Sequence, residues 1–230
     1  MPCSSGNRAW YCSGLADATS AGAGSRLVGN NVDLSRPGLG CVPLSCRPMS
    51  ESAFIVRVPE SEACVGALRK RFDASVRLGV PAHITLLVPF MSPGLIADSV
   101  LRDAQAALSQ VPAFEFTLDR VARFPATAYL ARNPAQPFVE LTQALVRKFP
   151  GFPPFGGQHE TVIPHLTVAN GDAEEAAAAA VELGALLRLH GHIRSVCASV
   201  SLLENSSGRW KEMHVFALPQ GVPDSVRSTL

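Results

Sequence analysis

Short apolar runs and segments with helical spacing of apolar residues alternate along the first half of the chain. The runs AFIVRV at 53–58 and HITLLVPF at 83–90 are rich in β-favouring residues, which predicts two strands. Apolar residues recur at helical spacing over 60–73 and again from Ser92 onward, so we predict a helix after each strand. The first half therefore has a predicted β-α-β-α order.

The second half has a similar pattern. FEFTLDRVARF and AYLAR, within 114–132, predict two strands joined by a turn at Pro125, and 137–149 predicts an amphipathic helix. TVIPHLTVA at 161–169 predicts a further strand, and Asp172 is suited to be the N-cap of the Ala-rich helix that follows.

The chain closes with the alternating runs VCASVSLLE and WKEMHVFAL, which NSSG at 205–208 joins in the manner of a hairpin. The expected fold class is α+β with antiparallel strands. The segments PAHITLLV and IPHLTVA also resemble each other, because each places Pro before a His-apolar-Thr-apolar strand and each precedes a long helix. Two related halves would place these strands side by side.

Composition sets the limits of the folded part. Residues 1–48 are rich in Gly, Ser, Ala and Asn and show no periodicity, so we predict a disordered extension there, a folded domain over 49–222 and a tail over 223–230. A chain of 230 residues that is 47% hydrophobic can bury the core of one domain or two small lobes.

Localisation and partners follow from what the chain lacks. No apolar run reaches the roughly 18 residues of a membrane span, and the start does not resemble a secretory signal, so we expect a cytoplasmic protein without a membrane partner. The formal net charge is +1 without a Lys/Arg block, which argues against a long nucleic-acid footprint. Cys64 and Cys197 fall in helix and strand patterns as small buried residues. The other cysteines lack the paired spacing of a zinc site: Cys3, Cys12, Cys41 and Cys46.

The two similar strands carry the candidate chemistry. Side chains alternate between the faces of a strand, so His83 and Thr85 project from one side, as do His165 and Thr167. Cleavage of a phosphodiester needs a base, an acid and donors for the phosphate oxygens. Imidazole titrates near neutral pH, so one neutral and one protonated histidine can supply base and acid without a metal.

A structural explanation competes with this one. A single His-x-Thr match arises easily by chance. Its histidine can be a core residue hydrogen-bonded to the backbone, and its threonine can be present for its β propensity. Two copies in matching strand contexts, each led by proline, favour the functional interpretation.

HITL at 83–86 and HLTV at 165–168 resemble the twin H-apolar-[ST]-apolar signatures of the 2H phosphoesterase superfamily, and above all its 2'-5' RNA ligase-like bacterial branch. The resemblance covers roughly 51–218. It implies a bilobal, pseudo-two-fold α+β fold with antiparallel sheets lining a central cleft and helices outside. It further implies metal-independent cyclic phosphodiesterase or RNA-end activity, with no cofactor. The few basic residues around the motifs depart from what a long RNA partner would need.

Other candidates carry weaker signals, and each has an ordinary structural alternative in surface exposure, core packing or hairpin packing. The substrate-binding candidates are Arg123, Phe124, His159, Arg209, Trp210 and Lys211. His190 and His192 end a predicted helix and are expected to be structural. A metal site formed by them with His214 would lack the usual carboxylate or cysteine partners, so we predict no metal.

We expect a phosphodiesterase that acts on a cyclic phosphate or phosphodiester of a small nucleotide or RNA end. Two rival hypotheses are a nucleotide or RNA-end binding module without turnover and a metallohydrolase that uses the same histidines. The residues leave open the substrate, the direction of reaction, the oligomeric state and which histidine is the acid.

Overall fold

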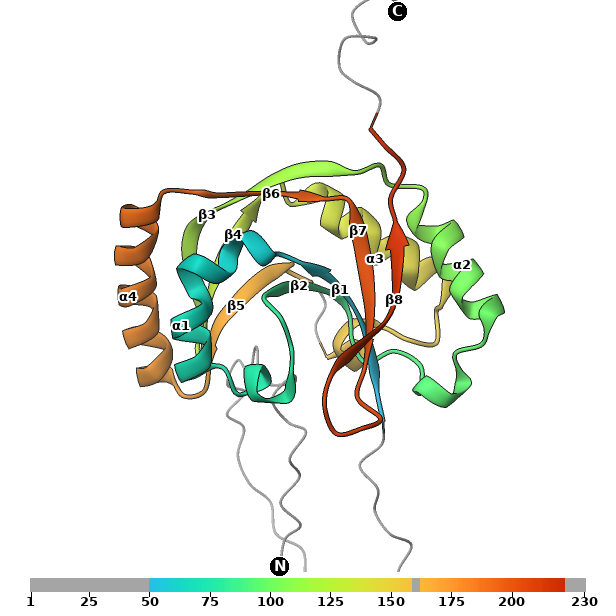
Figure 1. Ribbon diagram of the computed structural model, residues 1–230, viewed down its shortest axis with the longest axis horizontal. Helices are drawn as coiled ribbons and strands as arrows, with labels where there is room; N and C mark the ends of the chain where they lie inside the picture. Colours follow the sequence, from blue (N-terminus) through green and yellow to red (C-terminus); the bar gives the residue numbers. More distant parts are fainter. Residues whose placement is uncertain (1–49, 159–161, 222–230) are drawn as a thin grey trace, which may run out of the picture.

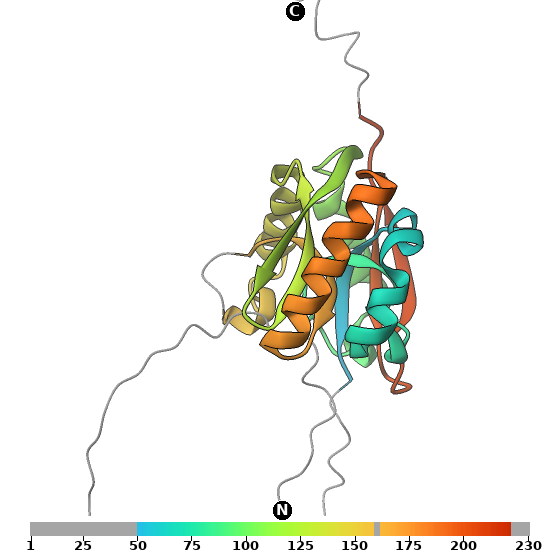
Figure 2. The same ribbon diagram turned by 90° about the vertical axis from the view of Figure 1, so that its left-hand side faces the viewer.

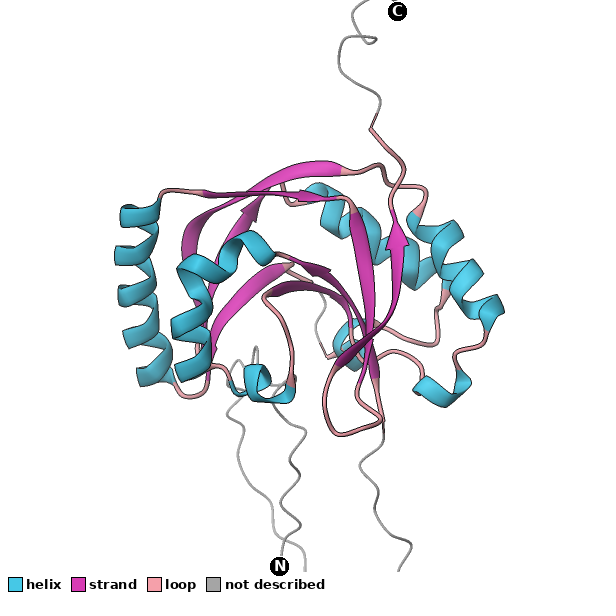
Figure 3. Cartoon of the chain, in the orientation of Figure 1, coloured by secondary structure: helices cyan, strands magenta, loops and turns pink. Residues whose placement is uncertain are grey.

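The computed structural model describes residues 50–158 and 162–221. Its eight strands form one antiparallel sheet (Figure 3). The strand order is β6-β3-β4-β5-β2-β1-β7-β8. The strands are β1 (Ser52–Arg57), β2 (His83–Leu87), β3 (Phe114–Phe124), β4 (Thr127–Asn133), β5 (His165–Asn170), β6 (Ile193–Cys197), β7 (Ser199–Glu204) and β8 (Lys211–Ala217). The predicted extension at 1–48 and the tail at 223–230 lie outside the described residues.

The two motif strands meet at the centre of the sheet. β2 pairs with β5 in antiparallel register, with Ile84 opposite Leu166, and three further strands continue the sheet on either side. The prediction that the two similar strands lie side by side is therefore confirmed.

Four helices complete the fold: α1 (Glu62–Phe72), α2 (Asp98–Leu108), α3 (Gln136–Lys148) and α4 (Ala173–His190). The helices α1 and α4 pack together against β3, β4 and β5, whereas α2 and α3 pack together near β2 and β8 (Figures 1 and 2). The order β1-α1-β2-α2 thus recurs as β4-α3-β5-α4, and the first helix of each repeat packs against the motif strand of the other. This arrangement confirms the expected bilobal, pseudo-two-fold α+β fold, with the two lobes sharing a single sheet.

One face of the sheet forms the main core. Apolar residues from all four helices pack there with Ile84 and Leu86 of β2 and Leu166 and Val168 of β5. Because strand residues alternate, the histidines and threonines of the motifs occupy the opposite face. Cys64 and Cys197 are free and buried, in the helix and strand where their patterns placed them.

Several predicted boundaries were wrong. The helix expected from Ser92 begins at Asp98, because the 3-10 turn Pro93–Leu95 ends at Ile96, whose backbone is extended. The strand expected over 161–169 begins only at His165, after Pro164, which has no N–H to donate to a ladder.

The run VCASVSLLE was predicted as one strand and forms parts of two. It breaks at Ala198, and β6 pairs with β3 while β7 pairs with β1. The chain therefore crosses here from one half of the sheet to the other, which strand periodicity alone does not reveal. The predicted hairpin between β7 and β8 is confirmed.

In the part of the chain that the structure describes, no helix is both long and apolar enough to cross a membrane.

Asp172 caps α4 as predicted, and its replacement has a measurable expected effect. Its carboxylate accepts hydrogen bonds from the backbone N–H groups of Glu174 (2.9 Å) and Glu175 (2.8 Å). Asp172→Ala should lower the free energy of unfolding by about 1 kcal/mol, measured by urea denaturation, because two N–H groups lose their acceptor. Asp172→Ser, which can still cap, should recover most of the loss; an equal loss in both variants would contradict this role.

Candidate active site

The four motif side chains form a compact group across β2 and β5. Continuing the antiparallel register by one residue on each side of Ile84 and Leu166 places His83 opposite Thr167 and Thr85 opposite His165. The two histidines are then diagonal neighbours, with backbones about 7–8 Å apart. Each imidazole has the hydroxyl of the other motif across from it.

The same backbone contact orients both imidazole rings. Nδ1 of His83 lies 2.8 Å from the carbonyl oxygen of Pro81, and Nδ1 of His165 lies 2.6 Å from that of Ile163. A carbonyl can only accept, so Nδ1 carries the proton in both rings, and the lone pair of the neutral ring is on Nε2. In His83 this Nε2 lies 3.1 Å from Oγ1 of Thr85, whose hydroxyl can donate to it.

Burial disfavours the charged form of both rings. Burial is the largest of the causes that lower the pKa of His83 from 6.5 to about 4; the positive charges of Arg69 and His165 act in the same direction, and the Pro81 carbonyl and Asp73 oppose the shift. Burial likewise lowers the pKa of His165, as does Arg132, while the hydrogen bond to Ile163 opposes the shift. Because His165 lowers the pKa of His83, protonation of one ring disfavours protonation of the other.

A buried ion pair supports the His83 side. Arg69, only 2% exposed, donates from Nη2 (3.0 Å) and Nε (3.2 Å) to Oδ2 of Asp73, and Nη2 also reaches the carbonyl of Val80 (3.3 Å). The carboxylate of Glu62 accepts from the N–H of Ala82 (3.0 Å). These bonds hold the backbone on both sides of Pro81, the acceptor of the His83 ring. This pair was not predicted from the sequence, although Arg69 and Asp73 have the i, i+4 spacing of a helical ion pair.

Two aromatic rings pack against His165. The ring centroid of Phe124 lies 5.2 Å from that of His165, and the centroid of Tyr129 lies 4.7 Å from it. Phe124 and Tyr129 also stack on each other at 4.6 Å. Phe124 was a predicted substrate-binding residue and lies beside the motif. Tyr129 was missed; on β4 it lies directly opposite Thr167.

The lowered histidine pKa values predict a loss of stability in acid. Below pH 6.5 the unfolded chain binds protons at these histidines that the folded chain excludes, so stability should fall as the pH drops from 6.5 towards 4. For His83 alone the loss should be on the order of 3 kcal/mol. His83→Gln, which does not titrate, should flatten the pH dependence of the unfolding midpoint. An unchanged dependence would contradict the burial argument; His190→Gln, at an exposed helix end, is the control.

The remaining predicted binding residues have structural contacts. Arg123 donates to the carbonyl of Ala173 at the start of α4 (3.2 Å), and its partner in the sheet, Ala128, packs with residues of the helix side. Arg123 thus lies away from the motif face and is not brought together with His83 and His165. His159 lies outside the described residues.

The hairpin candidates also pack. Arg209 donates to the carbonyl of Arg77 (3.2 Å), and Lys211 pairs with Glu204 (2.9 Å). Trp210 is 6% exposed and belongs to a small apolar cluster with Ile55 and other residues. This burial favours packing over stacking on a ligand.

Metal chemistry has no candidate ligand set in the described residues, which contain no group of three or more His, Cys, Asp or Glu side chains placed to hold an ion. His190 ends α4 and His192 follows it, both exposed, as the sequence placed them.

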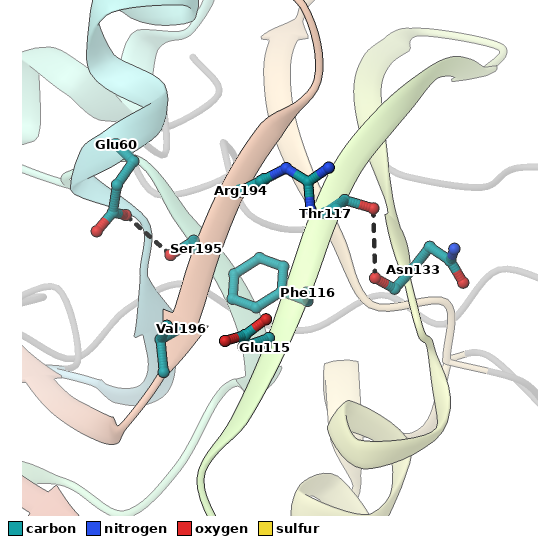
Figure 4. Close-up of a pocket in the computed structure, with 8 residues that line it drawn as sticks. All are labelled: Glu60, Glu115, Phe116, Thr117, Asn133, Arg194, Ser195 and Val196. Carbon is teal, nitrogen blue, oxygen red and sulfur yellow. Dashed lines mark hydrogen bonds between the residues drawn. The ribbon is translucent and has the colours of Figure 1, made fainter.

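A separate hollow of about 410 Å³ lies between the outer strands β3 and β6 (Figure 4). Its lining includes Arg194, Thr117 and the carboxylates of Glu60 and Glu115, and Glu60 accepts a hydrogen bond from Ser195 (2.8 Å). None of the four motif residues lines this hollow, so it is distinct from the motif group.

Comparisons with solved structures and protein-family models relate this chain to known proteins. E. coli LigT in complex with NADP+ is 15% identical, with a TM-score of 0.46 over 74% of this chain and 99% of that one. TT0787 of Thermus thermophilus is 16% identical, with a TM-score of 0.47 over 75% of this chain and 100% of that one. A comparison with curated proteins found no significant match. The family model of the 2'-5' RNA ligase superfamily matches residues 57–209, which include both motifs and more than half of the chain. The chain therefore belongs to the 2'-5' RNA ligase superfamily.

Proposed function

We propose that this protein is a phosphodiesterase that acts on a cyclic phosphate or phosphodiester of a small nucleotide or RNA end. His83 and His165 are its proton-transfer groups, and Thr85 and Thr167 bind the phosphate. The observation that carries the proposal is the matched anchoring of the two rings: on adjacent strands, each Nδ1 bonds to the carbonyl two residues earlier. One such contact is enough to satisfy a histidine in a protein core. Two matching contacts on adjacent strands orient both Nε2 atoms, as proton transfer to and from one bound phosphate group would require.

The electrostatics suit one base and one acid. With its pKa lowered to about 4, His83 is neutral at pH 7 and can take a proton at Nε2, so we assign it the base role. The positive charge of a protonated ring is stabilised by a bound phosphate anion, which restores the proton affinity that burial removes from His165. His165 is then the acid.

Hydrolysis of a 2',3'-cyclic phosphate follows directly. His83 removes a proton from water as the water oxygen bonds to phosphorus, the bond between phosphorus and one ribose oxygen breaks, and His165 protonates that oxygen. The diagonal placement of the rings leaves the reacting phosphorus between base and acid.

The threonines complete the site. Thr85 and Thr167 lie on the same face as the rings, and their hydroxyls can donate to non-bridging phosphate oxygens as charge shifts onto them. In the free protein the Thr85 hydroxyl is instead beside Nε2 of His83. Binding of a phosphate would draw this hydroxyl away and free the base.

Product analysis tests the proposal. The protein is incubated with 2',3'-cyclic nucleotides and with 2'-5' linked dinucleotides, and the products are followed by ³¹P NMR and chromatography. We expect ring opening or cleavage to a phosphomonoester. Tight binding with every substrate recovered intact would instead support a binding module.

A further inference from the structure

The arginines near the two motif histidines differ in their partners. Near His83, Arg57 pairs with Glu212 (Nη1 to Oε2, 3.2 Å), and Arg69 pairs with Asp73 (Nη2 to Oδ2, 3.0 Å). Arg57 lies in register with His83 across β1 and β2. Both of these positive charges therefore already have a carboxylate.

Near His165 the arrangement is different. Arg120 on β3 lies opposite Ala131 on β4, and Ala131 lies opposite His165 on β5. Directly paired residues share a face, so Arg120 projects on the same side as His165, with only a methyl side chain between them. In the described part of the chain the side chains of Arg120 and Arg132 make no ion pair or hydrogen bond, and the Nε of Arg132 is buried without a partner.

Arg132 pairs with Leu118 in the sheet, so its side chain starts from the core face, at the end of β4, but its charge acts on this group. Burial lowers the pKa of Arg132, and Arg120 lowers it further, with Tyr129 opposing. The charge of Arg132 in turn lowers the pKa of His165. The repulsion between Arg120 and Arg132 and the buried, unbonded Nε–H of Arg132 both raise the free energy of the folded protein. A bound anion would offset the repulsion and accept this hydrogen bond.

We propose that Arg120 and Arg132 form a subsite for a second phosphate group of the substrate, on the β3–β4 side of His165. The inference rests on the proposed function for the position of the reacting phosphate. The planar guanidinium groups match the oxygens of a phosphate and supply positive charge that no described carboxylate neutralises. The second phosphate is either a terminal monoester or the next diester of an RNA chain.

The subsite ends before the outer hollow. Figure 4 shows Arg194 extending from β6 across β3, the strand that carries Arg120, but Glu60 and Glu115 line the same hollow. These carboxylates would repel a phosphate. The second phosphate is therefore placed beside Arg120 and Arg132 and not between β3 and β6.

The test compares kcat/KM for three substrates: adenosine 2',3'-cyclic phosphate, the same nucleotide with a 5'-phosphate, and a dinucleotide that ends in the cyclic phosphate. The wild type should prefer one or both of the latter by about 10-fold to 100-fold, as expected for charge-assisted hydrogen bonds. Preference for the 5'-phosphorylated nucleotide alone identifies a terminal phosphate as the ligand, and preference for the dinucleotide identifies the RNA chain.

Arg120→Gln and Arg132→Gln should each bring this preference close to one. Arg71→Gln is the matched control, because Arg71 is exposed, pairs with Glu182 on the helical side and should keep the preference. Absence of any preference in the wild type, or full preference in either glutamine variant, would overturn the subsite. If Arg132→Gln does not fold, the exposed Arg120→Gln decides the question.

A binding measurement separates this inference from the proposed function. If no cyclic phosphate is turned over, calorimetry compares adenosine 3',5'-bisphosphate with 3'-AMP. Binding of the bisphosphate should be tighter by about 10-fold or more, and the glutamine variants should lose the difference. Equal affinities in the wild type, or an unchanged difference in the variants, would refute the subsite whatever the catalytic result.

Discussion

Replacing either His83 or His165 by alanine is expected to lower turnover of a cyclic phosphate by roughly 10²-fold to 10⁴-fold with the fold intact. Each ring supplies one of two proton transfers in a single transition state, so losing either one removes most of the catalysis. Steady-state kinetics on adenosine 2',3'-cyclic phosphate, with circular dichroism to verify folding, measures the effect.

The double variant provides an internal check. Because both rings serve one transition state, His83→Ala combined with His165→Ala should be far less damaging than the product of the two single losses. His190→Ala, at the exposed end of α4, should retain full activity. A folded single variant with near-normal turnover would reject the twin-histidine mechanism and favour the binding module.

Asp73→Ala is expected to destabilise the protein by about 3 kcal/mol, because it removes the buried carboxylate that is hydrogen-bonded to Arg69 and leaves the guanidinium only its longer, half-exposed ion pair with Glu62 (3.6 Å). The same carboxylate also accepts the N–H of Ser75 (3.0 Å). Chemical denaturation should show the loss as a lower midpoint at an unchanged slope.

The matched control is Glu182→Ala, which breaks the exposed pair with Arg71 and should cost less than about 1 kcal/mol. The double variant Arg69→Met with Asp73→Ala should be more stable than Asp73→Ala alone, since it also removes the buried guanidinium that has lost its hydrogen-bonded carboxylate. Similar losses for Asp73→Ala and Glu182→Ala would contradict a buried role for the Arg69 pair.

The central part of the fold could be predicted from the strand pattern around the two motifs. Alternation in HITLL and HLTV placed the polar side chains on one face, and their similarity predicted the β2–β5 pair. What the pattern could not show was long-range. The crossing at Ala198 depends on which strands β6 and β7 meet, and a continuous alternating run is compatible with either one strand or two.

In the candidate site, too, local features could be predicted from the sequence and long-range contacts could not. Spacing alone was enough to predict that the side chains of His83 and Thr85 share a face, as do those of His165 and Thr167, because period-two alternation is a local property of a strand. The neighbours of His165 come from β3 and β4, far from the motif in sequence: Arg120, Phe124, Tyr129 and Arg132. The sequence has few basic residues around the motifs, yet strand pairing brings Arg120 to the face of His165, and the charge of Arg132 acts on this ring. Such proximity depends on which strands pair and in which register, and the hydrophobic pattern of one segment does not predict this pairing.

The pH dependence of kcat/KM for adenosine 2',3'-cyclic phosphate tests the central claim most directly, since it reports the ionisation of base and acid in the free enzyme. One ring must be neutral and the other protonated, and both pKa values are lowered, so we predict a bell-shaped profile with its maximum below pH 6.5. His83→Ala should remove the acidic limb and His165→Ala the alkaline limb. A profile without a bell, or one that either substitution leaves unchanged, would contradict the assignment of these histidines as base and acid.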